Sequence, residues 1–173
     1  MIQVRAGVLA MAALGLGACG QIVLGPPDAV SASADRQAPT GPRPDFQRHA
    51  GETYAEFSSQ EAMRGYSLAG LGVAGAEAER FNHAMTHQAA GVVANGGGVQ
   101  ALVFSGCAPT GCLEGLSVVA VDVTTGEAFV GVSDMSGAAE LVPNDRLEAL
   151  LRLTSPSQSW DDPVRPQAGG ATP

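Results

Sequence analysis

The sequence has 173 residues, with 17 acidic side chains against 9 basic ones, all of them arginine, and a formal net charge of −8 at pH 7. Nucleic acids and anionic membrane surfaces attract cationic patches, so this acidic chain without a basic cluster is not expected to bind either of them electrostatically. About 100 residues lie between two proline-rich segments, at 19–50 and 154–173, which is enough for one two-layer core but small for a large catalytic cleft.

The N-terminus has the pattern of a lipoprotein signal peptide. Residues 6–16 follow Arg5 and carry no charge, a stretch too short to span a bilayer but long enough for the apolar part of a signal peptide. The tetrapeptide Leu-Gly-Ala-Cys at 16–19 resembles a bacterial lipoprotein box. We therefore predict that residues 1–18 are removed and that Cys19 carries lipid, palmitate included, for stable membrane attachment. An ordinary secreted protein that is cleaved nearby is the alternative.

The predicted anchor also indicates a location and a domain organisation. Gly20 rather than aspartate follows Cys19, so a known signal for inner-membrane retention is missing. We expect an outer-membrane anchor that faces the periplasm, with the inner membrane as the alternative. Residues 19–50 and 154–173 are rich in proline and poor in large apolar residues, which favours a disordered tether and a disordered tail. One folded domain is predicted over 51–153.

Two helices are predicted in the first half of this domain, over 53–64 and 76–90, because apolar residues recur there every three or four positions. Residues 70–75 spell G-x-G-x-x-G, but no buried strand precedes them, so we interpret them as a loop between the helices rather than a dinucleotide site. His83 and His87 would share one face of the second helix. Alanine follows His83 where a metalloprotease has glutamate, so no metal site is predicted.

The second half of the domain is predicted to form a sheet and a final helix. Strands are expected over 99–105, 116–123 and 128–132, where apolar and β-branched residues alternate or run together, with a Thr-Thr-Gly-Glu turn before the third strand. Asn144 is expected to cap a helix over 145–153. The predicted fold class is α+β, with an antiparallel meander sheet of three or more strands and helices packed on one face.

The three cysteines have different predicted roles. Lipid occupies Cys19, and the periplasm is oxidising, so Cys107 and Cys112 are left to pair with each other. This disulfide would close the loop between the first two strands, and its entropic stabilisation of roughly 2 kcal/mol suggests that its main role is to fix the shape of the loop. The spacing does not match the C-x-x-C of a redox enzyme or a zinc knuckle. Since no Ser-His-Asp order stands out either, we predict no enzyme activity and no cofactor.

The run 101–112, Ala-Leu-Val-Phe-Ser-Gly-Cys-Ala-Pro-Thr-Gly-Cys, followed by a strand, a turn and another strand, resembles the inhibitor of vertebrate lysozyme family of periplasmic proteins. The resemblance implies an antiparallel sheet backed by helices, with a protruding C-K-P-H-D-C loop that blocks the active-site cleft of chicken-type lysozyme. It assigns partner binding to Ala108, Pro109, Thr110 and Gly111. Ala108 stands at the position of the family's lysine, Thr110 at that of its histidine and Gly111 at that of its aspartate.

The sequence therefore predicts a membrane-anchored envelope lipoprotein that inhibits a lysozyme-like, peptidoglycan-cleaving enzyme through the loop from Cys107 to Cys112. Removal of Arg5 with the signal peptide leaves 8 arginines against 17 acidic residues, a charge of −9 that would attract a basic lysozyme. The alternative is a lipoprotein of the same fold that binds another periplasmic partner without inhibiting lysozyme.

Overall fold

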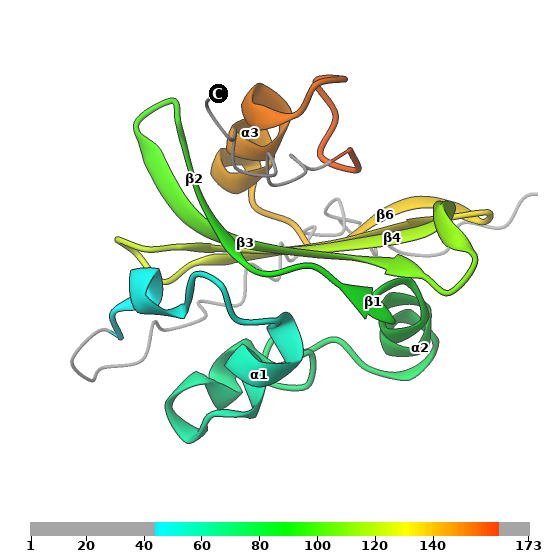
Figure 1. Ribbon diagram of the computed structural model, residues 1–173, viewed down its shortest axis with the longest axis horizontal. Coiled ribbons are helices and arrows are strands. Elements are labelled where there is room, and N and C mark those ends of the chain that lie inside the picture. The colour runs from blue at the N-terminus through cyan, green and yellow to red at the C-terminus, as the bar shows by residue number, and fades with distance from the viewer. Residues whose placement is uncertain (1–43, 163–173) are drawn as a thin grey trace, which may run out of the picture. The chain divides into compact units, whose positions relative to one another are not determined.

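The computed structural model describes residues 44–162, so the predicted signal peptide and Cys19 lie outside the described part of the chain. These residues form an α+β fold in which helices pack against a six-stranded antiparallel sheet (Figure 1). The predicted fold class is confirmed. The strands are β1 (His87–Gln88), β2 (Val92–Gly96), β3 (Val99–Ala108), β4 (Gly111–Asp122), β5 (Ala128–Asp134) and β6 (Gly137–Val142).

Strand β3 is the centre of the sheet. One of its edges pairs first with β2 and then with β1, and its other edge pairs with β4. The meander continues from β4 to β5 and from β5 to β6, with every pair antiparallel. The three strands predicted from the sequence correspond to β3, β4 and β5, and the alternation of their side chains places one row of apolar residues on each face of the sheet.

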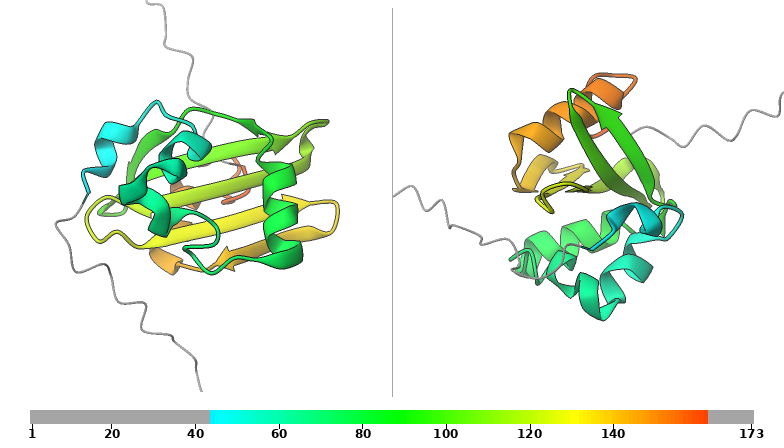
Figure 2. Two further views of the ribbon diagram at one scale, coloured as in Figure 1. Left: turned by 90° about the horizontal axis from the view of Figure 1, so that it is seen from below. Right: turned by 90° about the vertical axis from the view of Figure 1, so that its left-hand side faces the viewer.

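Helices cover both faces of the sheet (Figure 2). The sequence analysis placed them on one face only, but the leucine stripe of the last helix packs on the opposite face from the others. The first face holds the 3₁₀ helices η1 (Phe46–His49) and η2 (Glu61–Tyr66) with α1 (Tyr54–Ser59) and α2 (Gly75–Ala84), and the second holds α3 (Asp145–Thr154). None of the helices within 44–162 is long and apolar enough to cross a membrane.

The two predicted N-terminal helices are shorter than expected. The first is divided into α1 and η2, and its start is fixed by a capping box in which Thr53 and Glu56 bond each other's backbone N–H groups. The second ends at Ala84, and the chain is already extended at His87, where it pairs with β3. The prediction of a helix over 76–90 is therefore wrong after Ala84, because pairing with β3 outweighs the helix propensity of the following alanines.

The first core lies between the N-terminal helices and the sheet and is rich in aromatic residues. Phe57 stacks on Phe104 of β3 with ring centroids 4.9 Å apart. The Tyr54 hydroxyl donates a buried hydrogen bond of 2.8 Å to the carbonyl of Tyr66, whose own hydroxyl donates to the Gly126 carbonyl at 3.2 Å. These bonds connect α1, η2 and the β4–β5 turn, and they satisfy the polar ends of both tyrosines.

The second core lies under α3, and Trp160 closes it. Trp160 is only 4% exposed and packs edge-on against Phe129 with ring centroids 5.5 Å apart. The ring lies so close to β5 that a Cβ atom on Gly131 would come within 2.5 Å of it. Near the N-terminal end of the described residues, Phe46 is buried in the first core. The predicted domain boundaries at 51 and 153 are therefore corrected outward, because aromatic side chains beyond both of them belong to the cores.

Candidate functional site

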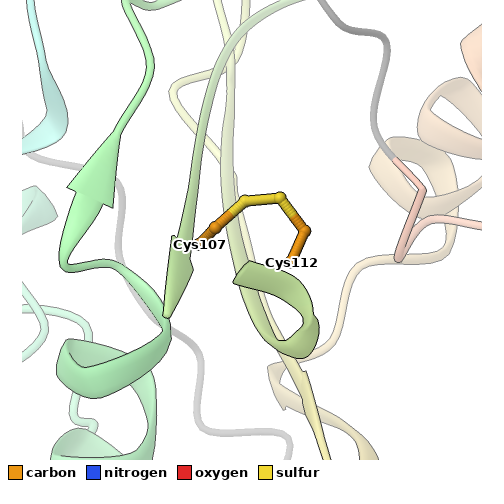
Figure 3. The surroundings of a disulfide bond; sticks show 2 residues. All are labelled: Cys107 and Cys112. Atoms are coloured by element: carbon orange, nitrogen blue, oxygen red, sulfur yellow. A yellow bond between two sulfur atoms is a disulfide. The ribbon is translucent and has the colours of Figure 1, made fainter. Parts of the chain in front are cut away.

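The hairpin between β3 and β4 carries the predicted disulfide. Pro109 and Thr110 form its turn, with Ala108 opposite Gly111 across the hairpin. Gly111 has a φ of +124°, a conformation that side-chain-bearing residues rarely adopt. The bond from Cys107 to Cys112 joins the end of β3 to the start of β4, with the two Cα atoms 4.5 Å apart (Figure 3). The turn is thus held as a closed ring.

A bulge in β4 follows the ring. Ala108 pairs with Gly111, whereas Cys107 pairs with Leu116, so the backbone of residues 112–115 is not paired with β3. Figure 3 shows this segment as a coil of ribbon beside Cys112. Cys112, Leu113 and Glu114 are exposed in this segment, and Leu113 is 98% exposed. The disulfide therefore anchors one end of a short coil that presents a large apolar side chain to solvent.

The C-terminal end of α2 supports the hairpin from the first face of the sheet. A Cβ atom on Gly115 would lie 3.2 Å from the Cβ of Ala84, and one on Gly106 would lie 2.5 Å from the sulfur of Met85. Ala108 is fully buried in the same layer. The assignment of Ala108 as a partner contact is therefore corrected, because its side chain points into the protein. Pro109 and Thr110 are exposed, and Gly111 is half-buried.

The opposite face of the same hairpin forms one side of a cleft of about 690 Å³. His87 enters from β1, where it pairs with Cys107, and Leu116 contributes an apolar side chain from β4. Asp161 and Asp162 line it from the segment after α3. The remaining lining residues are Ala89, Ser105, Gly106, Cys107, Thr110, Gly111, Cys112 and Leu113.

The carboxylate of Asp161 is held by two hydroxyl groups. The Ser133 hydroxyl of β5 donates a hydrogen bond of 3.2 Å to Oδ2, and the Ser159 hydroxyl donates one to Oδ1. Burial of the adjacent Trp160 ties this segment to the sheet. Sequence reasoning missed both aspartates because it assigned them to the tail. The tryptophan beside them was the available signal, since a single large aromatic residue in a polar segment is a candidate anchor.

The β5–β6 turn lies at the same end of the sheet as the β3–β4 hairpin, because alternate turns of a meander share an end. Gly115 pairs with Asp134, so the bulge of β4 and the end of β5 are neighbours. Met135 follows Asp134 in the turn and is 85% exposed. Two of the three exposed large apolar side chains in residues 44–162, Leu113 and Met135, therefore lie at this one end, which we call the hairpin end.

No three His, Cys, Asp or Glu side chains gather as a metal site within 44–162. His83 and His87 do not share a helix face, because α2 ends at Ala84 and His87 belongs to β1. The glycine-rich string at 70–75 forms a turn before α2 and follows a 3₁₀ helix rather than a buried strand.

No protein-family model, no curated protein and no solved structure matches this chain. The resemblance to the lysozyme inhibitors therefore rests on the disulfide ring and the strands beside it. The geometry adds three features at the hairpin end that the resemblance does not include. They are the exposed Leu113, the exposed Met135 and the cleft lined by Asp161 and Asp162.

Proposed function

We propose that this chain is a lipid-anchored envelope protein that binds and inhibits a lysozyme-like, peptidoglycan-cleaving enzyme through its hairpin end. The observation that carries the proposal is the placement of Leu113, which is 98% exposed on a coil anchored by the Cys107–Cys112 disulfide. A large apolar side chain on a constrained support loses little conformational freedom when a partner buries it. Most of the binding energy at protein interfaces comes from a few such anchors.

The surroundings of Leu113 support a protein partner. Isolated exposed apolar residues are common on protein surfaces, but here Met135 lies at the same end of the sheet and a cleft opens beside the coil. The chain has a formal net charge of −8, which favours encounter with a basic protein. Lysozyme-like enzymes are the candidate because the ring and its flanking strands resemble the family of lysozyme inhibitors.

A second candidate is a protein of the same fold that binds another periplasmic partner. The exposed turn favours it, because Pro109 and Thr110 carry no charge there and Ala108 is buried. The Thr110 hydroxyl is a neutral donor, so the one hydrogen bond that it can donate to a catalytic carboxylate is weaker than the bond from a protonated histidine. Binding would then depend more on Leu113 and the cleft than on the turn.

The test uses the mature chain with Cys19→Ser, which cannot be lipidated. Cell-wall lysis by chicken-type and other lysozymes is measured at low salt with micromolar protein. Inhibition is expected, and Leu113→Gln should weaken it about tenfold, the loss that follows from removal of about 1.4 kcal/mol of apolar contact. Leu153→Gln is the matched control, since Leu153 is 67% exposed near the β2–β3 turn, at the other end of β3.

Unchanged lysis with every enzyme would contradict the first candidate. The second candidate is then tested by affinity capture from periplasmic extract with the same three proteins. A captured protein that is lost with Leu113→Gln and retained with Leu153→Gln supports binding through the hairpin end. Equal capture by both variants contradicts it.

A further inference from the structure

We infer that the cleft beside the disulfide ring receives an arginine side chain of the partner protein. The inference rests on the proposed function only in taking the partner to be a protein, and it applies to both candidate partners. The volume of the cleft, about 690 Å³, lies within the range of roughly 300–1,000 Å³ that is usual for binding pockets. One side chain does not fill this space, so residues on either side of the arginine also contact the cleft.

The apolar lining of the cleft suits the aliphatic part of an arginine. Leu116 lines the cleft and is almost completely buried, and the Cys107–Cys112 disulfide borders the same space. Arginine buries its methylene groups along apolar surfaces while its guanidinium group remains near polar groups or water. A disulfide and a leucine offer such a surface, whereas a small inorganic cation would gain nothing from them.

The two aspartates suit the guanidinium group. The Asp161 carboxylate is oriented by the hydroxyls of Ser133 and Ser159, and each of its oxygens has a further lone pair for an incoming donor. The Asp162 side chain has no hydrogen bond or ion pair with another residue of the described chain. The planar, multiply donating guanidinium group matches carboxylates better than an ammonium group does.

No arginine within 44–162 lines the cleft, so the described chain does not neutralise the two aspartates itself. Arg80 is paired with Asp134, Arg146 lies near Asp122, and Arg152 is paired with Glu148. His87 is the one basic side chain among the cleft-lining residues, and it lies on β1. The excess negative charge at the cleft therefore selects a cationic group from the partner.

The test is an NMR titration of the folded Cys19→Ser chain with a tripeptide that has leucines around a central arginine. The control peptide carries citrulline, which has nearly the same shape and no charge. Shifts are expected at the backbone amides of Leu116, Asp161 and Asp162, with at least fivefold weaker binding of the citrulline peptide. Equal binding of the two peptides, or shifts confined to other parts of the chain, would overturn the inference.

Two acidic-to-amide variants locate the binding. Asp162→Asn should weaken arginine-peptide binding about fivefold, as expected for about 1 kcal/mol of lost ion pairing. It leaves the Ser133–Asp161 hydrogen bond in place, so the fold is expected to persist, and the amide spectrum checks this. The double variant Asp45→Asn with Glu61→Gln removes two negative charges, twice as many as Asp162→Asn, from the exposed surface of the other face. Equal weakening by the double variant would overturn the inference.

A third variant addresses the arginine nearest in sequence to the cleft. Arg165 follows Asp162 by three positions. Arg165→Gln should leave binding of the arginine peptide unchanged or make it tighter, because the substitution removes a like charge. Weaker binding would contradict the inference.

These measurements use no lysozyme, so their outcome is independent of the lysis assay. Lysozyme inhibition that survives Asp162→Asn without loss would overturn the cleft inference and leave the proposed function standing. Binding of the arginine peptide without inhibition of any lysozyme would contradict the first candidate function and leave the cleft inference standing.

Discussion

Arg80 donates two hydrogen bonds to Asp134, from Nε to Oδ2 at 2.8 Å and from Nη2 to Oδ1 at 2.7 Å. The same Nη2 group also donates to the Gly137 carbonyl at 3.0 Å. One side chain of α2 thus contacts both strands that flank the β5–β6 turn, where Met135 is exposed. Through this contact α2, which crosses the sheet, holds the two strands of the hairpin end in place (Figure 2).

Replacement of Arg80 by methionine should lower the free energy of unfolding by about 1 kcal/mol, because the ion pair is partly exposed. The hydrogen bonds from Arg80 lower the pKa of Asp134 in the folded protein, while the pKa is ordinary in the unfolded chain. The stabilisation is therefore complete above the ordinary pKa and is lost as the pH falls through the lowered one. Urea unfolding at neutral and acidic pH should show a smaller difference between wild type and Arg80→Met in acid. A difference that grows in acid would contradict this account.

Trp160→Ala should destabilise the fold by about 3 kcal/mol, the usual cost of removing a large buried aromatic side chain. Trp160→Phe is the conservative control and should cost less, since a smaller ring still covers Gly131. Urea unfolding followed by circular dichroism measures both. Trp160 is the one tryptophan of the chain, so its emission should shift to longer wavelength as the wild type unfolds. A wild-type spectrum already typical of solvent-exposed tryptophan would show that the residue does not pack on β5.

The double variant Cys107→Ser with Cys112→Ser should unfold with a free energy about 2 kcal/mol lower than that of the wild type, because the unfolded chain regains the freedom of a short loop. The fold itself should remain, since neither sulfur belongs to the two hydrophobic cores. Far-UV circular dichroism and urea unfolding test both points. The wild type treated with reductant should behave like the double variant. Loss of the sheet signal in the variant would mean that the ring is needed for β3–β4 pairing.

Alkaline conditions should unfold the protein through its buried tyrosines. Burial raises the pKa of both Tyr54 and Tyr66 above the ordinary value of 10.0, whereas the unfolded chain ionises near that value. Stability is therefore complete below the ordinary pKa and declines as the pH rises above it. Tyr54→Phe should make this decline shallower, but it should also cost about 1 kcal/mol at neutral pH through loss of the bond to the Tyr66 carbonyl. An equally steep decline in the variant would assign the alkaline transition to other groups.

The sequence predicted the centre of the fold well because its signals are local. The alternation in β3 and the Asn144-capped leucine stripe of α3 each depend on residues close together in the chain. The end of α2 depends on distant residues. The strand that begins at His87 forms only because β3 offers an unpaired edge opposite Cys107. Nothing near His87 in the sequence marks that edge.

The candidate site was predicted in part for the same reason. The pairing of Cys107 with Cys112 was predicted from the cysteine count together with the expected lipid on Cys19. The burial of Ala108 depends on α2, which reaches the hairpin from residues far earlier in the chain, and on Gly115, which leaves room for close contact. The cleft combines β1, the hairpin and Asp161. No pattern within any one of these segments indicates that they meet.

The stacking of Phe57 on Phe104 also has a consequence for the order in which the protein folds. From β2 to β6, each strand pairs with the next strand in the chain, and such local contacts favour rapid folding. The helical segment 46–66 has ring contacts of its own, but Tyr54 and Phe57 also pack on Phe104 of β3, which comes later in the chain. We therefore expect the meander to form early and the N-terminal helices to complete their packing by docking onto it.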